Sequence, residues 1–392
     1  MLKKEKEIFE KVSRLLSHFR RFDKRYQGIK LPLKTWQDFR AVSIVSKEDL
    51  RGYSVCKPFN ITATSGSTAT RLLIAHSRGC YQAHIHRLVT LYQSVGISQD
   101  DLCLNLCSYS LNSGGRMMEA AYKAAGAGVI PLGVLDSGAK TREAVDFVRE
   151  LRPTVVNSYT NQLFDFFSLL GRRHSIRMAI VNGEPLTKPF KARIEAMSGV
   201  KVYNHYGAME FSGFAVAQKH TDEYMKVFDN GLFIEVLRDD GTVSSTGEGA
   251  VLITDLGNTS MPFIRYKLGD KVEVRARRDG MYVKVLGRLA DSVLIDGEVY
   301  SISEIAAQGQ KGLKHPHFFF VINKDQGTYA DKVILNLPGS DMPRFNEIKS
   351  LFKKSFSFGN SLDIRSYQGE FPKTTTGKFR HVIDSRKNSE KA

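Results

Sequence analysis

The sequence predicts an α/β protein with a large N-terminal region and a small α+β C-terminal domain. Helix-like and strand-like segments alternate from about residue 70 to 205, which indicates a parallel sheet covered by helices. After Gly213, short β segments follow one another between Asp-Gly and Gly-rich turns, which indicates a β-rich, mostly antiparallel subdomain. From Arg288 a shorter mixture of β and α segments begins, of a size that suits a compact domain of about 100 residues.

The N-terminal segment is predicted to form an amphipathic helix. Apolar residues recur there at helical spacing, at Leu2, Phe9, Val12, Leu16 and Phe19. Charged residues interrupt every apolar step, which is not the pattern of a secretory signal peptide. We expect the apolar stripe to pack on the rest of the protein, with contact to a membrane surface as the alternative.

A further helix is predicted to begin after Ser46, because Asp49 lies three residues on in a capping-box pattern. The alternating segments come next. Strands are predicted near residues 72–77, 101–110, 128–134, 154–159 and 176–183, and helices near residues 80–95, 114–128, 141–151 and 161–171.

The composition changes near Gly287, between the two presumed domains. We therefore expect a large domain over residues 1–286, a hinge over 287–291 and a small domain over 292–392. The small domain contains the segments 291–308, 317–325, 331–339, 345–356 and 361–369.

The composition is that of a globular protein, with 42% hydrophobic residues, 25% charged residues and a net charge of +16. A basic balance suggests acidic partners such as nucleotides, coenzyme A or an acidic carrier protein. No zinc-finger, homeodomain or RNA-binding motif accompanies the charge, so no nucleic acid is expected. No apolar run approaches the ~18 residues of a membrane span.

Four cysteines are too few for a disulfide framework, so we expect reduced thiols and a cytoplasmic protein. Cys80, His84 and His86 lie close together in the sequence, but no other residue nearby completes a set of metal ligands. Buried thiols and surface histidines are the preferred interpretation of this segment.

Four hydroxyls surround one glycine in the segment Thr64, Ser65, Gly66, Ser67 and Thr68. Taken alone, such a cluster is more often a solvated turn. The alternative is a phosphate cradle, because glycine lets the backbone approach an anion while hydroxyl and amide groups donate hydrogen bonds. The P-loop pattern of nucleotide hydrolases is absent, so the choice depends on the rest of the chain.

Two segments in the middle of the chain carry groups that suit a nucleotide. Tyr206 followed by Gly207 can place a ring against a base, and Glu210 close by can hold Mg²⁺. Asp270 follows Gly269 at a predicted turn, where a carboxylate can accept both hydroxyls of a ribose. The alternatives are a core tyrosine beside a turn and an aspartate that serves only its turn.

Cationic residues mark the C-terminal third. Pro372 and Gly377 bracket a Thr-rich loop that ends on Lys378, which can bring a compact positive charge to a phosphate or an oxyanion. An exposed turn with a solvated lysine is the alternative. Arg288 follows Gly287, where it can bind nucleotide and mark a hinge.

The order and spacing of these segments resemble the motif series of the adenylate-forming enzymes, which include acyl-CoA synthetases and peptide-synthetase adenylation domains. The resemblance runs from about residue 40 to 385. Segments such as "VNGEPLT" and "MPFIRYKLGD" look most like the phenylacetate–coenzyme A ligase branch. The series comprises the Ser/Thr/Gly loop near residue 66, Gly-Glu-Pro at 183–185, Tyr-Gly-x-x-Glu at 206–210, Tyr-x-x-Gly-Asp at 266–270, Gly-Arg at 287–288 and Pro-Lys-Thr-x-x-Gly-Lys at 372–378.

The resemblance implies an enzyme that uses ATP and Mg²⁺ to convert a carboxylic acid to an acyl-adenylate. The acyl group then passes to a thiol, most commonly that of coenzyme A or of a carrier protein's phosphopantetheine. By branch, an aromatic or arylacetic acid is expected. The resemblance also implies the adenylate-forming fold, with a mobile small domain that rotates between the two half-reactions.

The family's functional residues carry over to matching positions of this chain. The β- and γ-phosphates would be held by Thr64, Ser65, Gly66, Ser67 and Thr68. The adenine site would be lined by Gly183, Glu184 and Pro185, with Tyr206 and Gly207 against the base, and Asp270 would bind the ribose. Glu210 would hold Mg²⁺, Arg288 would contact ribose or phosphate, and Lys378 would bridge the attacking carboxylate and the α-phosphate.

The chain departs from the family pattern at three positions. Ala69 replaces a glycine of the phosphate loop, Met209 replaces a hydroxyl residue before Glu210, and Ala290 replaces the acid of the hinge. These changes keep open a nucleotide-binding protein without catalytic activity. Transfer of the acyl group to a carrier protein or to an amine is the other alternative.

Overall fold

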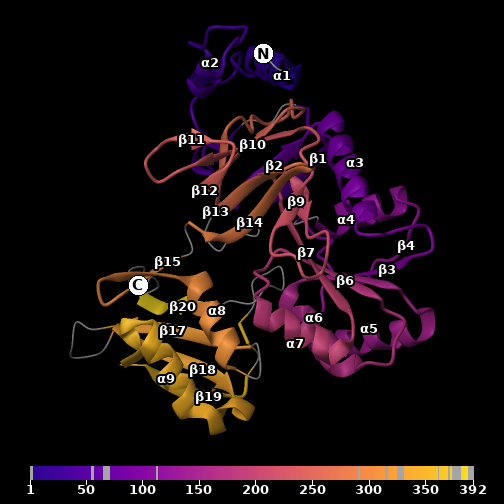
Figure 1. The fold of residues 1–392 in the computed structure, drawn as a ribbon, viewed down its shortest axis with the longest axis vertical. Coiled ribbons are helices and arrows are strands. Elements are labelled where there is room, and N and C mark those ends of the chain that lie inside the picture. The colour runs from indigo at the N-terminus through magenta and orange to yellow at the C-terminus, as the bar shows by residue number, and fades with distance from the viewer. Residues whose placement is uncertain are drawn as a thin grey trace. The chain divides into compact units, whose positions relative to one another are not determined.

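The computed structural model describes residues 3–53, 57–64, 71–111, 114–289, 292–313, 317–324, 331–360, 362–369, 371–372 and 381–386 (Figure 1). Contacts between residues divide the chain into two compact units. Unit 1 comprises Met1–Gly133 and Tyr203–Leu286, and unit 2 comprises Val134–Val202 and Gly287–Ala392. The division into domains 1–286 and 292–392 with a hinge between them stays a prediction, and residues 290 and 291 lie outside the described ranges.

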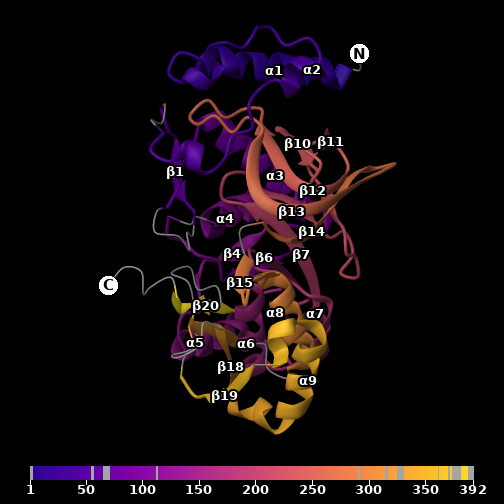
Figure 2. The same cartoon turned by 90° about the vertical axis from the view of Figure 1, so that its left-hand side faces the viewer.

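The predicted N-terminal helix is confirmed as α1 (Lys3–Phe19). Its apolar stripe is buried in the core of unit 1, while Leu2 lies outside the described residues. The short helix α2 (Trp36–Arg40) lies along α1 (Figure 2), and the ring of Trp36 meets that of Phe9 edge-on at 4.9 Å between centroids. The stripe therefore packs on the protein itself, which was the preferred expectation.

Only part of the expected helix after Ser46 forms. The Ser46 backbone N–H donates to Asp49 Oδ2 at 2.7 Å, and the Asp49 N–H donates to Ser46 Oγ at 3.3 Å, so the capping box is present. A single 3-10 turn, Glu48–Leu50, follows it. Gly52 then takes a φ of +70°, a left-handed conformation that ends the turn.

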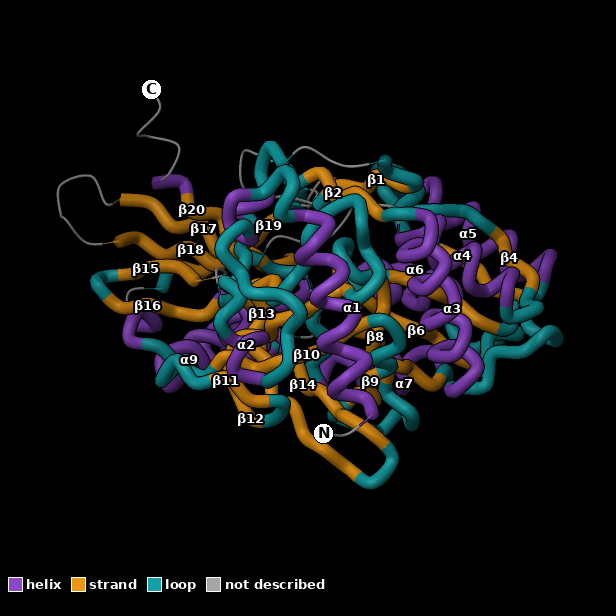
Figure 3. Tube along the Cα trace, turned by 90° about the horizontal axis from the view of Figure 1, so that it is seen from above, coloured by secondary structure: helices purple, strands orange, loops and turns teal. Residues whose placement is uncertain are grey.

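The next part of unit 1 contains the first alternating elements. Strands β1 and β2 form an antiparallel hairpin, and strands β3 and β4 pair in parallel. Helices α3 and α4 lie side by side (Figure 3), with the rings of Tyr92 and Tyr122 stacked 4.3 Å apart between centroids. The bounds are β1 (Asn60–Ala63), β2 (Leu73–His76), α3 (Arg78–Ser94), β3 (Leu102–Asn105), α4 (Gly114–Ala124) and β4 (Gly128–Ile130).

The rest of unit 1 is a sheet in which the strand order is β11-β10-β12-β13-β14-β9-β8-β7. Neighbouring strands such as β10 and β12, β7 and β8, and β8 and β9 are antiparallel, which confirms the predicted β-rich subdomain. Its strands are β7 (Lys201–Ala208), β8 (Ser212–Val216), β9 (Met225–Val227), β10 (Leu232–Leu237), β11 (Val243–Ser244), β12 (Gly247–Asp255), β13 (Tyr266–Arg277) and β14 (Gly280–Arg288).

Unit 2 begins with the second set of alternating elements. Strands β5 and β6 are parallel and every residue in them is buried, as expected for a sheet covered on both faces. Their bounds and those of the helices are α5 (Gly138–Leu151), β5 (Val155–Ser158), α6 (Thr160–Leu170), β6 (Met178–Asn182) and α7 (Lys188–Ser198).

The C-terminal part of unit 2 is the predicted smaller mixture of β and α elements. A four-stranded sheet of order β19-β18-β17-β20 packs with helices α8 and α9 around one apolar core. A separate antiparallel pair, β15 and β16, precedes it. The elements are β15 (Ser292–Ile295), β16 (Glu298–Ser301), α8 (Ile302–Gly312), β17 (Phe319–Lys324), β18 (Asp331–Pro338), α9 (Phe345–Ser355), β19 (Asp363–Tyr367) and β20 (Val382–Asp384). Within the described ranges, no helix is long and apolar enough to cross a membrane.

A buried histidine in unit 1 makes the stability of the protein dependent on pH. His205 of β7 is 3% exposed, and neither of its ring nitrogens has a hydrogen-bond partner among the residues that the structure describes. Its ring meets that of Tyr92 edge-on, at 5.8 Å between centroids. Burial lowers the pKa of His205 to about 4, so the ring is neutral in the folded protein at neutral pH.

We predict that His205→Leu makes the stability less sensitive to acid. The unfolded chain protonates a histidine near pH 6.5, whereas the folded chain protonates His205 only near pH 4. The contribution of His205 is therefore complete above about pH 6.5 and is lost as the pH falls toward 4. The measurement is the urea midpoint of unfolding between about pH 7 and 4.5, where the variant should show the shallower decline.

Some decline should remain in that variant, because burial also lowers the pKa of His381 to about 4. The matched control is His86→Leu, which changes an exposed histidine of α3 and should leave the slope as it is in the unmodified protein. Equal slopes for His205→Leu and the unmodified protein would assign the acid sensitivity to other groups.

Candidate active site

A bulged hairpin between β7 and β8 carries three of the predicted site residues. Gly207 pairs with Gly213, and the register shifts between Tyr206 and Gly207. A Cβ atom on Gly207 would lie 2.5 Å from the carbonyl oxygen of Ser212, so only glycine fits there. Glu210 lies in the turn that follows, and the residue is 5% exposed.

Asp270 lies in a bulge of strand β13, which corrects the expectation of a turn. Ala250 pairs with Lys271 and Leu252 with Lys267, so the register shifts and residues 268–270 form a bulge opposite β12. Gly269 takes a φ of +94° in this bulge, which favours glycine. A bulge redirects a side chain, and Asp270 ends 7% exposed.

Two tyrosine–carboxylate hydrogen bonds join the hairpin to this bulged strand. The Tyr206 hydroxyl donates to Asp270 Oδ2 at 2.7 Å. In the second bond the donor is on β13 instead of the hairpin, and the Tyr266 hydroxyl donates to Glu210 Oε1 at 3.0 Å. Each segment therefore supplies one tyrosine and one carboxylate, and the structure brings together Tyr206, Glu210 and Asp270 as residues of one local site in unit 1.

Tyr266 itself is held by a buried ion pair next to it. Arg265 Nε donates to Glu235 Oε2 at 3.2 Å, and Arg265 Nη1 donates to the carbonyl oxygens of Arg40 and Val42 at 2.6 and 2.8 Å. The Val45 carbonyl accepts the N–H of residue 267 at 2.8 Å. The strand that carries the two site residues is thus fixed against the N-terminal segment of the chain.

The turn that carries Glu210 is held from the other side by His76. His76 Nε2 lies 3.0 Å from the Glu210 carbonyl oxygen, and because a carbonyl only accepts, Nε2 carries the proton. Burial lowers the pKa of His76, so the ring is neutral at neutral pH. The backbone of Glu210 and its carboxylate are therefore fixed by different neighbours.

The donor set of this site fits the groups that the family resemblance implies. A carboxylate has lone pairs for several donors, so Asp270 can accept ribose hydroxyls beside the Tyr206 hydroxyl. The Glu210 carboxylate is a hard oxygen ligand of the kind that Mg²⁺ prefers.

Of the predicted phosphate-binding residues, the structure describes only the first, Thr64. The Thr64 N–H donates to the Leu72 carbonyl oxygen at 3.0 Å, and Thr64 Oγ1 accepts the Leu72 N–H at 3.2 Å. These bonds close the base of the loop that joins β1 to β2. The predicted residues Ser65, Gly66, Ser67 and Thr68 lie outside the described ranges.

In unit 2, Gly183, Glu184 and Pro185 follow the carboxyl end of strand β6, the edge of a parallel sheet at which ligands bind. Glu184 Oε2 accepts the N–H of Asn161 at 3.0 Å, in the first turn of α6. Negative charge is favourable at that end of a helix. The loop is therefore attached to the helix that follows the neighbouring strand β5.

Of the last two predicted residues, the structure describes Arg288 but not Lys378. Arg288 is the exposed last residue of β14, next to Gly287. Gly287 takes a φ of +149°, and a Cβ atom there would lie 3.1 Å from Ser303 Oγ. Lys378 lies outside the described residues, as does most of its loop.

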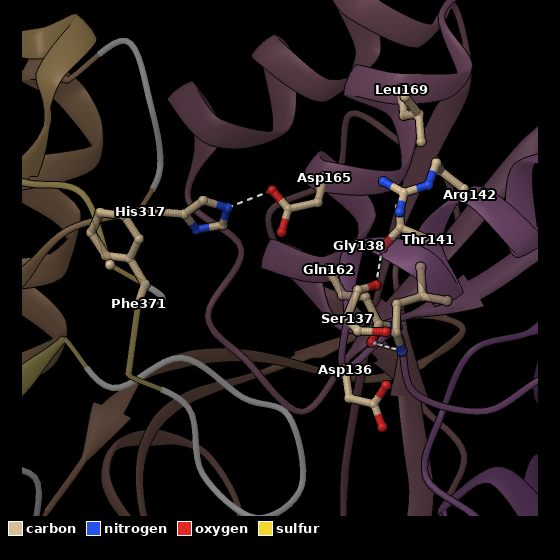
Figure 4. Close-up of a pocket in the computed structure, with 12 residues that line it drawn as sticks. Asp136, Ser137, Gly138, Thr141, Arg142, Gln162, Asp165, Leu169, His317 and Phe371 are labelled. Carbon is tan, nitrogen blue, oxygen red and sulfur yellow. Dashed lines mark hydrogen bonds and ion pairs between the residues drawn. The ribbon is translucent and has the colours of Figure 1, made fainter.

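Unit 2 also contains a pocket of about 320 Å³ that sequence reasoning did not identify (Figure 4). His317 Nε2 donates to Asp165 Oδ1 at 2.5 Å on one side, and Gln162 Oε1 accepts the Leu135 N–H at 2.8 Å on the other. Arg142 adds a cationic group to the lining. No predicted site residue lines the pocket, so it does not mark the predicted nucleotide site.

Sequence reasoning also missed the roles of Tyr266 and His76. Tyr266 lies within the Tyr-x-x-Gly-Asp motif, and its position four residues before Asp270 was the available signal. No signal pointed to His76, because its contact with Glu210 spans 134 positions of the chain.

Known proteins resemble this chain in sequence and in fold. No protein-family model matches the chain. The chain is 23% identical to a phenylacetate-coenzyme A ligase of Aromatoleum evansii, over 90% of this chain and 86% of that relative.

Solved structures are similar over nearly the whole chain. A 2-hydroxyisobutyryl-CoA ligase in the postadenylation state, with bound 2-HIB-AMP, has a TM-score of 0.83 at 20% identity and covers 100% of this chain and 92% of that one. An amide bond synthetase from Marinactinospora thermotolerans has a TM-score of 0.59 at 17% identity and covers 81% of this chain and 67% of that one. The chain therefore has the fold of the adenylate-forming enzymes, which confirms the fold class and the family resemblance predicted from its sequence.

Proposed function

We propose that this protein is an AMP-forming acid–thiol ligase. A carboxylate oxygen of the substrate attacks the α-phosphate of ATP, and pyrophosphate leaves. A thiol then attacks the acyl carbon, loses its proton, and AMP leaves as the thioester forms. The main support for the proposal is the pair of tyrosine–carboxylate hydrogen bonds. One joins residues 56 positions apart and the other joins residues 64 positions apart, and together they bring the segments of Glu210 and Asp270 into one site.

The residues of unit 1 have distinct roles in this proposal. Asp270, oriented by the Tyr206 hydroxyl at 2.7 Å, binds the ribose of ATP. Glu210, oriented by the Tyr266 hydroxyl at 3.0 Å, holds Mg²⁺, which neutralises phosphate charge when bound. Thr64 and the loop after it hold the β- and γ-phosphates. Both oriented carboxylates are buried, so little reorganisation is needed when the ligand binds.

The remaining predicted residues complete the adenylation chemistry. Gly183, Glu184 and Pro185 line the adenine site, and Arg288 contacts ribose or phosphate. Lys378 supplies positive charge between the two anionic reactants, the substrate carboxylate and the α-phosphate. Holding two anions in reacting geometry needs local positive charge and fixed donors, which these groups provide.

The acid is proposed to be aromatic or arylacetic, and the acceptor to be coenzyme A. The similarity to a phenylacetate-coenzyme A ligase supports both choices. An amine acceptor is the second candidate, because an amide bond synthetase is among the similar solved structures. The net charge of +16 suits the phosphates of coenzyme A or an acidic carrier protein.

The proposal predicts ATP–pyrophosphate exchange that depends on a carboxylic acid. The full chain is assayed with Mg²⁺ across a panel of aromatic, arylacetic and short aliphatic acids. Exchange should be strongest with an aromatic or arylacetic acid and absent without acid. Mass spectrometry of reactions with coenzyme A or an amine then identifies the acceptor from the product, thioester or amide.

ATP binding without exchange for any acid would contradict the enzyme assignment. That result would favour the nucleotide-binding alternative and would give weight to Met209, which offers no hydroxyl to the α-phosphate. Ala69 and Ala290, the other departures from the family pattern, lie outside the described residues.

We predict that Tyr206→Phe raises the KM for ATP by about 5- to 30-fold in the exchange assay, because it removes one hydrogen bond to a buried carboxylate. Tyr206 is a positioning residue, so the maximal rate should change less than the KM. The matched control is Tyr224→Phe, which removes another tyrosine–carboxylate bond of unit 1, to Glu273 on the same strand β13 at 2.6 Å. An equal rise in KM for both variants would contradict a specific role for Tyr206.

Lys378→Ala separates the two half-reactions. We expect it to abolish acyl-adenylate formation and to leave thioester formation from supplied acyl-adenylate largely intact. The positive charge is needed where two anions meet, and no such encounter occurs in the second step. Rapid-mixing measurements of each half-reaction test this, and equal losses in both would refute the role given to Lys378.

A further inference from the structure

A second cluster of chemically reactive side chains lies in unit 1, apart from the carboxylates assigned above. His76, at the end of β2, and Cys80 and His84, on the first two turns of α3, each offer a ligand atom, and these atoms lie within 4.8 Å of one another. Among the described residues, no other group of His, Cys, Asp or Glu shows this arrangement. All three are buried, with 0 to 2% of each residue exposed.

Asp255, the last residue of β12, adds a fourth ligand atom to the cluster. Its Oδ2 lies 3.1 Å from both Cys80 Sγ and His84 Nε2, and Cys80 Sγ lies 3.4 Å from His84 Nε2. Four ligands at Zn–N, Zn–O and Zn–S distances of about 2.0 to 2.3 Å form a tetrahedron whose corners are about 3.3 to 3.7 Å apart. The three edges among Cys80, His84 and Asp255 are within a few tenths of an ångström of that tetrahedron, and the ligand atom of His76 lies within 4.8 Å of those of Cys80 and His84.

The neighbours of these residues hold them as metal ligands are usually held. Asp255 Oδ1 accepts the N–H groups of Gly257 at 2.9 Å and Asn258 at 3.1 Å, which leaves Oδ2 directed at Cys80 and His84. His76 Nε2 donates to the Glu210 carbonyl, and His76 Nδ1 is buried without a hydrogen-bond partner in the described part of the chain. A histidine that binds a metal through one nitrogen commonly donates its other N–H to a carbonyl.

The charges of the four ligands also suit a divalent cation. A Cys80 thiolate and the Asp255 carboxylate together neutralise Zn²⁺, which limits the cost of burying the ion. Arg87, one turn further along α3, is fully buried, but its guanidinium donates to the backbone carbonyls of Phe211, Gly213 and Asn230. The arginine is thus satisfied by the backbone and does not occupy Asp255 Oδ2.

We propose that His76, Cys80, His84 and Asp255 bind one structural Zn²⁺ ion. One thiolate, two imidazoles and one carboxylate are the ligand types that zinc takes in proteins, and four protein ligands leave no position for a substrate. The ion joins the start of α3 to the ends of β2 and β12. Through the His76 ring it also supports the backbone of the turn that carries Glu210.

The zinc site does not depend on the proposed ligase activity. Its ligands are not among the residues assigned to ATP, Mg²⁺ or the acyl group. Metal content and thermal stability test it directly, so a chain that lacks exchange activity can still contain the site.

The first experiment measures zinc in the untagged full chain by elemental mass spectrometry. We expect one equivalent of zinc after purification without added metal. Removal with a chelator should lower the melting temperature by at least about 5 °C, and added ZnCl₂ should restore it. Replacement by Co²⁺ should give the visible absorption of a tetrahedral site and a near-ultraviolet sulfur-to-cobalt band.

Variants assign the ligands. Cys80→Ser should remove the sulfur-to-cobalt band, and His84→Ala should lower bound zinc at least about tenfold at limiting metal. Two controls should retain one equivalent: His86→Ala, an exposed histidine on the same helix, and Cys103→Ser, a buried cysteine of β3. If a ligand variant does not fold, the cobalt spectrum of the unmodified chain still shows whether a thiolate binds the ion.

Three results would overturn the inference. These are a purified chain without metal whose melting temperature does not respond to ZnCl₂, a cobalt form without a sulfur band, and full zinc retention in both Cys80→Ser and His84→Ala. The first would establish that the cluster is a buried hydrogen-bond network around Asp255. The other two would place the ion elsewhere in the chain.

Discussion

Two tyrosine–carboxylate hydrogen bonds between the β7–β8 hairpin and strand β13 are the constraint on which the rest of unit 1 depends. The Tyr206 hydroxyl donates a hydrogen bond to the carboxylate of Asp270, and the Tyr266 hydroxyl donates one to that of Glu210. Both carboxylates are nearly buried, and a buried carboxylate without donors would cost several kcal/mol. The hairpin of β7 and β8 and the bulge of β13 therefore stabilise each other through these two hydrogen bonds.

Local backbone features make that arrangement possible. Gly207 lets the two strands of the hairpin approach so closely that a side chain would meet the Ser212 carbonyl, and Gly269 allows the bulge that directs Asp270. The Glu210 turn is held by His76 as well, which connects it to the end of β2 and the start of α3. The same turn is thus supported by the candidate active site on one side and by the proposed zinc cluster on the other.

Much of this could be predicted from sequence, because hydrophobic periodicity reports local structure and motif spacing reports chemistry. The alternation that predicted β5, α6 and β6 was confirmed, and so was the burial of the α1 stripe. The helix after Ser46 was overestimated, because a capping box marks a start and does not set a length. Asp255 could not be found beside Cys80 and His84, because it lies 171 positions from His84 and only the folded chain brings their side chains to 3.1 Å. His76, four residues before Cys80, was within reach of the sequence but was not included in the set considered.

The contact between Arg265 and the carbonyls of Arg40 and Val42 means that the amino-terminal segment helps to hold the strand of the candidate site. That segment contains none of the motifs, and a comparison of motifs alone would treat it as dispensable. A shortened form beginning beyond residue 45 would leave a buried guanidinium with fewer acceptors and would release the strand start at Tyr266. Engineering or natural variation that trims this end would thus loosen the support of Tyr266 and its neighbours, more than 200 positions away in the sequence.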